Sequence, residues 1–221
     1  MNQSVLSFKL EEAEKEMQLT GLAGIPLVYE IYRKLNLPDL INKQIKVKES
    51  GWKESELVET IVSLSIAGGD HMEDVKLFSV DHALQSLVEK EDHRGEEGPK
   101  NQEGPYPSAK ALERFLKRFH QEQVKPEEKD AWVPKESKAL KRLAKVVYAK
   151  TTKRLIEMSG LKTITIENDA TAVFSHKEEA LGTYKGGTGY MPVTGSIAEL
   201  GLIIGDEFRD GNVPPLYKVR E

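Results

Sequence analysis

The sequence predicts an α+β fold, in which a helical N-terminal region precedes an antiparallel sheet. Three observations predict it. Apolar side chains recur at helical spacing from residue 26 to residue 88, and again from residue 108 to residue 158. A run of β-branched residues, which suit a pleated surface better than a helix, begins at Thr163. Glycine-rich turns follow that run, as they do between antiparallel strands.

The composition narrows the classes of protein. With 221 residues and 38% hydrophobic content, the chain can form a core for one or two domains. Cysteine is absent, which excludes disulfides and thiolate metal ligands and favours a cytoplasmic location. No apolar run is long enough for a signal peptide or a membrane span, so we expect a soluble protein. Because the net charge is −4, DNA binding needs locally concentrated positive charge.

The first part of the chain is predicted to be a polar lead-in over residues 1–20 and a helical domain over residues 21–88. The segment from Leu57 to Ile66 has little polar surface, so its helix is expected at the centre of the core. Asp81 is placed to cap a later helix. The first helix is expected to bury the apolar side chains that follow Pro26, which are Leu27, Val28, Ile31 and Leu35.

Acidic side chains and one imidazole are concentrated between Asp70 and Asp74, where two interpretations are open. One is a metal site. The other, which we favour, is a helix cap in which Asp70 and Glu73 form a capping box. Acids in the first turn of a helix complement its dipole, and side chains this close in sequence do not all face one ion.

Residues 89–107 are predicted to be a flexible linker, because Gly, Pro and charged residues leave almost no aliphatic side chains to bury. Two amphipathic helices are expected over residues 108–158, the first of them capped by Ser108. Their polar faces are basic, and such faces either neutralise DNA phosphates or are ordinary solvated surface. The candidate DNA-binding residues are Lys110, Arg114, Lys117, Arg118, Lys138, Lys141, Arg142, Lys145, Lys150, Lys153 and Arg154.

The last segment, residues 159–221, contains the predicted sheet. A first strand should run from about Lys162 toward Asp169, and two further strands should join around Leu200 and Gly201. The turn between Lys185 and Gly189 lacks the spacing of a phosphate-binding loop, so we expect a simple turn there. Asp169 would then end a strand beside a hairpin, as a metal-binding acid of a two-metal nuclease does, because such ligands must be held by rigid backbone. The alternative is an ordinary exposed aspartate in a turn.

Short motifs occur in a fixed order along almost the whole chain, and in that order they resemble bacterial insertion-sequence transposases with an Asp-Asp-Glu active site. The motifs are Gly21-Leu22-Ala23-Gly24-Ile25-Pro26, Glu56-Leu57-Val58, Ala67-Gly68-Gly69-Asp70, Glu73-Asp74, Pro107-Ser108, Arg114-Phe115-Leu116-Lys117-Arg118-Phe119, Glu167-Asn168-Asp169-Ala170-Thr171, His176-Lys177-Glu178, Tyr184-Lys185-Gly186, Gly189-Tyr190-Met191-Pro192, Ala198-Glu199-Leu200-Gly201 and Arg209-Asp210-Gly211-Asn212. Two positions depart from the family pattern. Glu167 stands where relatives often have Asp, and Val213 follows Asn212 where a His is common.

The resemblance implies that residues 159–221 are the first three antiparallel strands of a truncated ribonuclease-H-like domain. It also implies that Asp169 is the first of three metal-binding, catalytic carboxylates, with Glu167 at best an accessory ligand. The other two carboxylates are expected beyond Glu221, so we expect a fragment that is inactive alone. The complete enzyme is expected to use Mg²⁺ or Mn²⁺. Expected partners are the terminal repeats of transposon DNA, a full-length transposase or a second copy.

Two other interpretations remain open. The chain is either a non-catalytic DNA-binding or assembly module, which needs the basic helices and not Asp169, or the product of a decayed reading frame with no role. No arrangement of Ser175 or Ser196 with a base suggests a nucleophilic enzyme.

Overall fold

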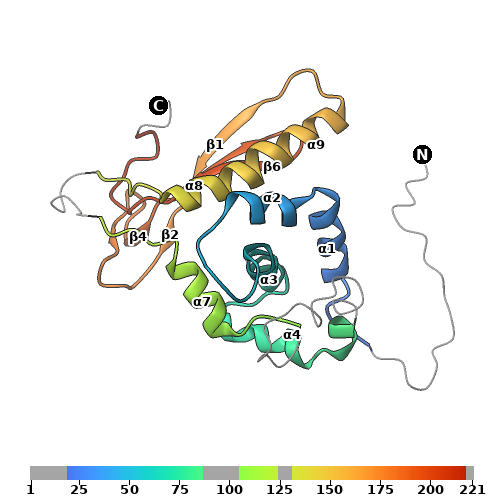
Figure 1. The fold of residues 1–221 in the computed structure, drawn as a ribbon. Coiled ribbons are helices and arrows are strands. Elements are labelled where there is room, and N and C mark those ends of the chain that lie inside the picture. The colour runs from blue at the N-terminus through green and yellow to red at the C-terminus, as the bar shows by residue number, and fades with distance from the viewer. Residues whose placement is uncertain (1–18, 87–104, 124–130, 218–221) are drawn as a thin grey trace.

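The computed structural model describes residues 19–86, 105–123 and 131–217 (Figure 1). Most of the predicted lead-in and most of the predicted linker lie outside these residues. The described part combines helices with two small antiparallel sheets, so the predicted α+β class is confirmed. None of its helices has both the length and the apolar run that a bilayer span requires.

Helix α3 (Glu54–Ile66) lies at the centre of the helical part, viewed along its axis in Figure 1. Leu57 and Leu64 on this helix are almost completely buried, which confirms the predicted central helix. Shorter elements surround it. They are α1 (Ile25–Lys34), α2 (Leu37–Gln44), the 3₁₀ turn η1 (Met72–Val75), α4 (Lys76–Val80) and α7 (Ala109–Lys117).

One apolar core joins residues from both predicted helical segments. The ring of Phe78, which is fully buried, lies 5.1 Å from the ring of Tyr106. The hydroxyl oxygens of Tyr29 and Tyr106 are 3.0 Å apart, within hydrogen-bond distance. Leu112 and Phe115 of α7 belong to the same core. Tyr106, near the end of the predicted linker, is therefore a core residue.

Helix α1 begins where Pro26 predicts, but only part of the predicted apolar set is covered: Val28 and Leu35 are half-buried. Leu27 and Ile31 are 44% and 59% exposed. Tyrosines take their place because each combines a large apolar ring with a hydroxyl that finds a buried partner; that of Tyr32 donates to the carbonyl oxygen of Ser55 at 3.0 Å. The buried residues of α1 are Ile25, Tyr29 and Tyr32.

Two predicted helix caps are present. The Ser108 hydroxyl accepts the backbone N–H of Ala111 at the start of α7. The Asp81 carboxylate accepts the backbone N–H of Leu84 at 2.9 Å, as a capping residue does. These side chains satisfy N–H groups that the first helical turn leaves without partners.

The acids near residue 70 act as a cap, although the capping residue is not the predicted one. The Asp74 carboxylate accepts the backbone N–H groups of both Asp70 and His71, each at 2.9 Å. The N–H of His71 is the main reason why the pKa of Asp74 lies below its ordinary value. The capping box therefore pairs His71 with Asp74 rather than Asp70 with Glu73.

A long interrupted helix crosses above α2 in Figure 1 and consists of α8 (Lys138–Ala144), the π turn η2 (Lys145–Lys150) and α9 (Thr151–Ser159). A π turn has more residues than an α turn, so it shifts the direction of the side chains that follow. Val146 in this turn is buried against Tyr32, Ile41 and Ile45.

The larger sheet has the order β1-β5-β6, with β1 (Ile166–Ala170), β5 (Val193–Ile197) and β6 (Leu202–Glu207) antiparallel. This confirms the three predicted strands, although β1 begins at Ile166 rather than near Lys162. A second sheet, which the sequence patterns do not predict, has the order β2-β4-β3. Its strands are β2 (Val173–Phe174), β3 (Leu181–Gly182) and β4 (Thr188–Tyr190).

We expect Phe78→Ala to lower the free energy of unfolding by about 3–5 kcal/mol, because it leaves a cavity beside Tyr106. Leu77 is 51% exposed, so Leu77→Ala, the matched control, should change it by only about 0.5 kcal/mol. Urea denaturation followed by circular dichroism measures both. Equal destabilisation of the two variants would contradict the assigned core.

Replacing Gly189 tests the second sheet. A Cβ at Gly189 would lie 2.2 Å from the carbonyl oxygen of Val173, so Gly189→Ala should separate β2 from β4 at a cost of about 1–3 kcal/mol. Nothing lies within 4 Å of a Cβ at Gly182, which makes Gly182→Ala the control. A Gly189→Ala variant as stable as the Gly182→Ala variant in thermal denaturation would show that the two strands do not pair as described.

Candidate metal and nucleic-acid site

Asp169 is the next-to-last residue of β1, and its side chain is exposed. In the antiparallel pairing of β1 with β5 it stands opposite Thr194. The Thr171 hydroxyl donates a hydrogen bond to the carboxylate of Asp169 at 3.2 Å. The predicted position at the end of a first strand is therefore confirmed, and the carboxylate faces solvent with oxygen atoms to offer a cation.

The acids nearest to Asp169 along the sheet are Glu167 and Asp206. Glu167 precedes it by two residues, so both side chains lie on one face of β1. Asp206 stands opposite Thr194 on the far side of β5, two strands from Asp169. Neighbouring strands are about 4.8 Å apart, so the backbones of Asp169 and Asp206 are separated by roughly 10 Å.

In two acids of this region, Glu199 and Asp206, the carboxylate has a partner other than a metal ion, and a third, Asp210, is buried. The Glu199 carboxylate accepts the backbone N–H and the hydroxyl of Thr165, and these bonds hold its pKa below the ordinary value. Asp206 accepts a hydrogen bond from Tyr148. Asp210 is buried and forms a β-bridge with Tyr190.

The described residues do not fit a two-metal site. Two metal ions about 4 Å apart require several converging carboxylates. Within the described ranges, no group of three or more His, Asp or Glu side chains is placed to hold one ion. Asp169 has one exposed carboxylate, and Glu167 is the nearest acid to it along the strand.

The motif from Arg209 to Asn212 has a structural role. The buried guanidinium of Arg209 pairs with the Glu207 carboxylate at 2.5 Å and donates to the carbonyl oxygen of Pro215 at 3.3 Å. A Cβ at Gly211 would lie 2.3 Å from the carbonyl oxygen of Leu181, so only glycine fits beside β3. The motif therefore attaches the end of β6 to the second sheet.

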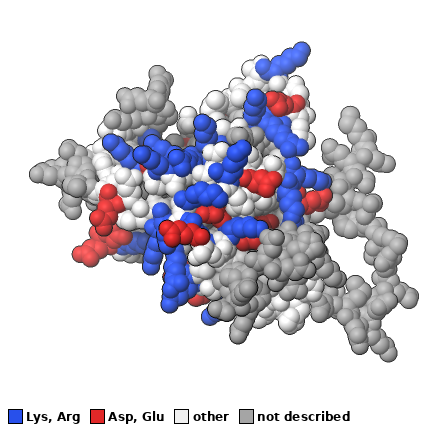
Figure 2. All heavy atoms as spheres, viewed as in Figure 1, with Lys and Arg blue, Asp and Glu red and all other residues white. Residues whose placement is uncertain are grey.

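The candidate DNA-binding residues form part of a broad basic surface. Ten of the eleven are exposed, and the side chain of the eleventh, Lys150, lies outside the described part. Figure 2 shows Lys and Arg gathered over α8 and α9 and along α7, with a few acids between them. Two of the arginines also join elements: Arg154 donates to the carbonyl oxygen of Lys34, and Arg118 to that of Val47.

A pocket of about 730 Å³ separates η2 and α9 from the sheet, with Ile156, Ile197 and Ile204 among its lining residues. At one end the Tyr148 hydroxyl donates to Asp206 at 2.5 Å, and Glu136 also lines the pocket. Burial, followed by the charge of Asp206, raises the pKa of Glu136.

Sequence reasoning missed Lys48, which lies next to Arg114 and Arg118 in the folded chain. Lys46 and Lys48 lie shortly after the end of α2, and lysines in such a position are only a weak signal for surface charge. Nothing in the sequence shows that this loop folds against α7, because the two segments are far apart along the chain.

No family profile, curated protein or solved structure matches this chain.

The raised pKa of Glu136 predicts a pH-dependent stability difference. The folded state holds the Glu136 proton more tightly than the unfolded state, whose pKa is near the ordinary value of 4.5, so stability is lost as pH rises through the folded-state pKa. Glu136→Gln should therefore be more stable than the wild type at pH 7 and equal to it below pH 4.5. Because Glu136 is only partly buried, the gain should stay below about 1 kcal/mol.

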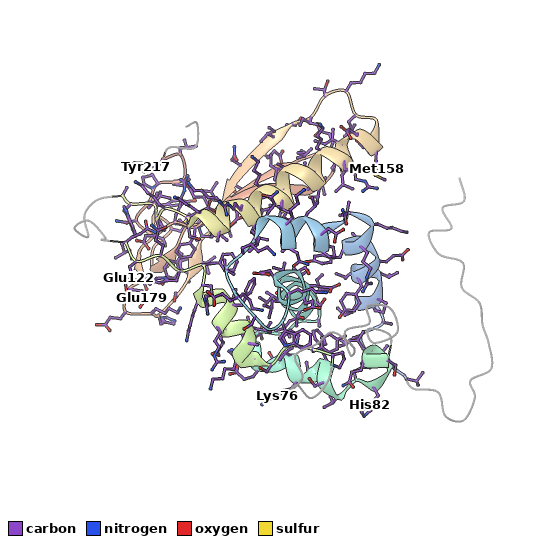
Figure 3. All side chains as sticks on the ribbon, viewed as in Figure 1. Lys76, His82, Glu122, Met158, Glu179 and Tyr217 are labelled. Carbon is purple, nitrogen blue, oxygen red and sulfur yellow. The ribbon has the colours of Figure 1, made fainter. Side chains whose placement is uncertain are left out.

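Chemical denaturation at several pH values measures this difference. Glu179→Gln is the control, because Glu179 (labelled in Figure 3) is exposed and is not among the residues that line the pocket of Glu136. Destabilisation of Glu136→Gln at pH 7 would show that the Glu136 carboxylate makes favourable contacts there.

Proposed function

We propose that this chain is the N-terminal part of a transposase of the Asp-Asp-Glu class, and that complete relatives bind transposon ends and cleave and join DNA. The observation that carries the proposal is the position of Asp169, exposed on the first strand of an antiparallel β1-β5-β6 sheet. Three antiparallel strands with an acid on the first are the beginning expected of a ribonuclease-H-like domain. The order of the sequence motifs supports the same assignment.

Asp169 is proposed as a ligand of Mg²⁺ or Mn²⁺ in the complete enzyme. Bound metal ions would activate water or a 3′ hydroxyl for attack on phosphorus. The strand fixes the backbone of Asp169 through its pairing with β5, and Thr171 orients the carboxylate. The remaining ligands of such a site would come from outside the described residues.

DNA is the proposed partner of the basic surface on α7, α8 and α9. Exposed Lys and Arg side chains neutralise phosphates and release counterions, which gives affinity that depends little on sequence. A cytoplasmic location is proposed with this function and agrees with the absence of cysteine.

A non-catalytic DNA-binding or assembly module is the second candidate. The sheet order leaves β1 at an edge, with one side unpaired by any described strand. Exposed strand edges pair readily with other chains, so β1 offers a place where a second copy or a full-length transposase would add a strand. This function needs the basic surface and the free edge, but not the carboxylate of Asp169.

Three neighbouring cations of the basic surface, Lys141, Arg142 and Lys145 at the end of α8 and the start of η2, are called the α8 surface here. DNA binding by this surface is tested by replacing the three residues together with Gln. We expect weaker binding and a flatter plot of log affinity against log salt, by about 0.9 for each phosphate that the variant no longer neutralises. Fluorescence anisotropy with a labelled duplex measures both. The matched control removes three charges elsewhere, at Lys76, Lys177 and Lys185; Figure 3 shows Lys76 on the side of the helical part opposite α8 and α9. Equal binding by both variants would show that the α8 surface does not bind DNA and is ordinary solvated surface.

Catalysis is tested with supercoiled plasmid and Mg²⁺ or Mn²⁺. We expect no nicking by the purified chain, because no group of three or more acidic or imidazole ligands surrounds Asp169 within the described ranges, and no difference on Asp169→Ala. Agarose gel electrophoresis measures the nicked fraction. Nicking by the wild type that disappears in Asp169→Ala would overturn this expectation and would require further ligands from this chain or from a second copy.

A further inference from the structure

A basic pocket of about 430 Å³ lies between α7 and the loop that precedes α3. Lys48 contributes from the loop, and Arg114 and Arg118 contribute from α7. Glu49 is the single carboxylate among the lining residues, so the lining has a net charge of +2. The volume falls within the range of small-ligand sites.

Two of the three cations are held in place by the protein itself. The Lys48 ammonium donates to the backbone carbonyl of Trp52, so the loop folds around it. The Arg118 guanidinium donates to the carbonyl oxygen of Val47 at 3.2 Å. Each cation has further N–H donors, and their fixed position lowers the entropy cost of binding a ligand.

None of the three cations of the pocket, Lys48, Arg114 and Arg118, has a carboxylate ion-pair partner among the described residues. Burial is the main reason why the pKa of Lys48 is lowered; the charges of Glu54 and Glu56 act in the opposite direction, and Arg118 has the smallest effect, lowering it. A bound anion would favour the charged form of Lys48 and pair with the two arginines.

The wall of the pocket contains a buried aromatic ring and a tight turn. Trp52 is 5% exposed, and its indole nitrogen has no acceptor among the described residues. Gly51, beside it, has a φ of 85°, which favours glycine. The loop therefore keeps a fixed shape next to the three cations, with Leu57 and Phe115 also lining the pocket.

We propose that this pocket binds a phosphoryl group, carried either by the DNA backbone or by free phosphate. Two arginines and a lysine supply several charge-assisted donors, and the planar guanidinium matches the geometry of phosphate oxygens. For the DNA source the inference rests on the proposed function; for free phosphate it stands independently. The pocket would fix one phosphate at a defined position, whereas the α8 surface offers spread charge.

The DNA arm of the test uses the full chain and a labelled duplex. Arg114 makes no hydrogen bond to the described residues, so Arg114→Gln should leave the fold intact, which circular dichroism verifies. We expect about tenfold weaker binding for Arg114→Gln, the effect of removing one charge-assisted bond, and a salt dependence flatter by about 0.9. Lys177→Gln, an exposed charge on the sheet part, is the control and should bind as the wild type does.

The phosphate arm uses Trp52 as a local reporter. The chain has two tryptophans, so Trp132→Phe leaves Trp52 alone. Inorganic phosphate should change Trp52 fluorescence relative to sodium chloride at equal ionic strength, and Arg114→Gln should abolish the change. If phosphate changes the Trp52 fluorescence but neither the wild type nor any variant binds DNA, the phosphate-binding pocket is supported and the proposed DNA-binding function is contradicted. DNA binding that Arg114→Gln leaves at the control level, together with no phosphate response, would overturn the pocket and leave the proposed function standing.

Discussion

The π turn η2 attaches the sheet to the helical part. Val146 packs among Tyr32, Ile41 and Ile45 on one side, and Tyr148, two residues later, donates its hydroxyl to Asp206 of β6. A regular α-helix turns about 200° over two residues, and the wider π turn changes this angle while keeping the helix continuous. The position of the β1-β5-β6 sheet, and therefore of Asp169, relative to the basic helices depends on this turn.

The sequence predicts most of the elements because their signals are local. The β-branched run that begins at Thr163 indicates the region of the first strand, although only its last residue, Ile166, belongs to β1. Ser108 and Asp81 identify helix starts through short-range hydrogen bonds. The predicted face of α1 is only partly correct, because apolar spacing alone does not show that Tyr29 and Tyr32 have buried hydroxyl partners elsewhere. Such partners are known only once the chain has folded.

The candidate site also has features that local sequence signals predict and features that depend on the folded chain. The exposure of Asp169 follows from its place near the end of a strand, and the exposure of the basic residues follows from helical periodicity. The second sheet escapes prediction because its strands have only two or three residues each and depend on crowded backbone contacts at Gly189 and Gly211. The pocket around Lys48 escapes it because its cations come from segments separated along the chain. Pattern reasoning therefore locates single residues better than it locates their neighbours.

The exposure of β1 on both faces has a consequence for its dynamics. Most of its side chains lie in solvent, and described strands pair with it only along β5. Few apolar contacts then oppose its separation from β5, so β1 should open locally at a small fraction of the free energy needed to unfold the helical core. Any strand that paired with the free edge would suppress this opening and protect the β1 amides from hydrogen exchange. The carboxylate of Asp169 would then be held as firmly as the residues around α3.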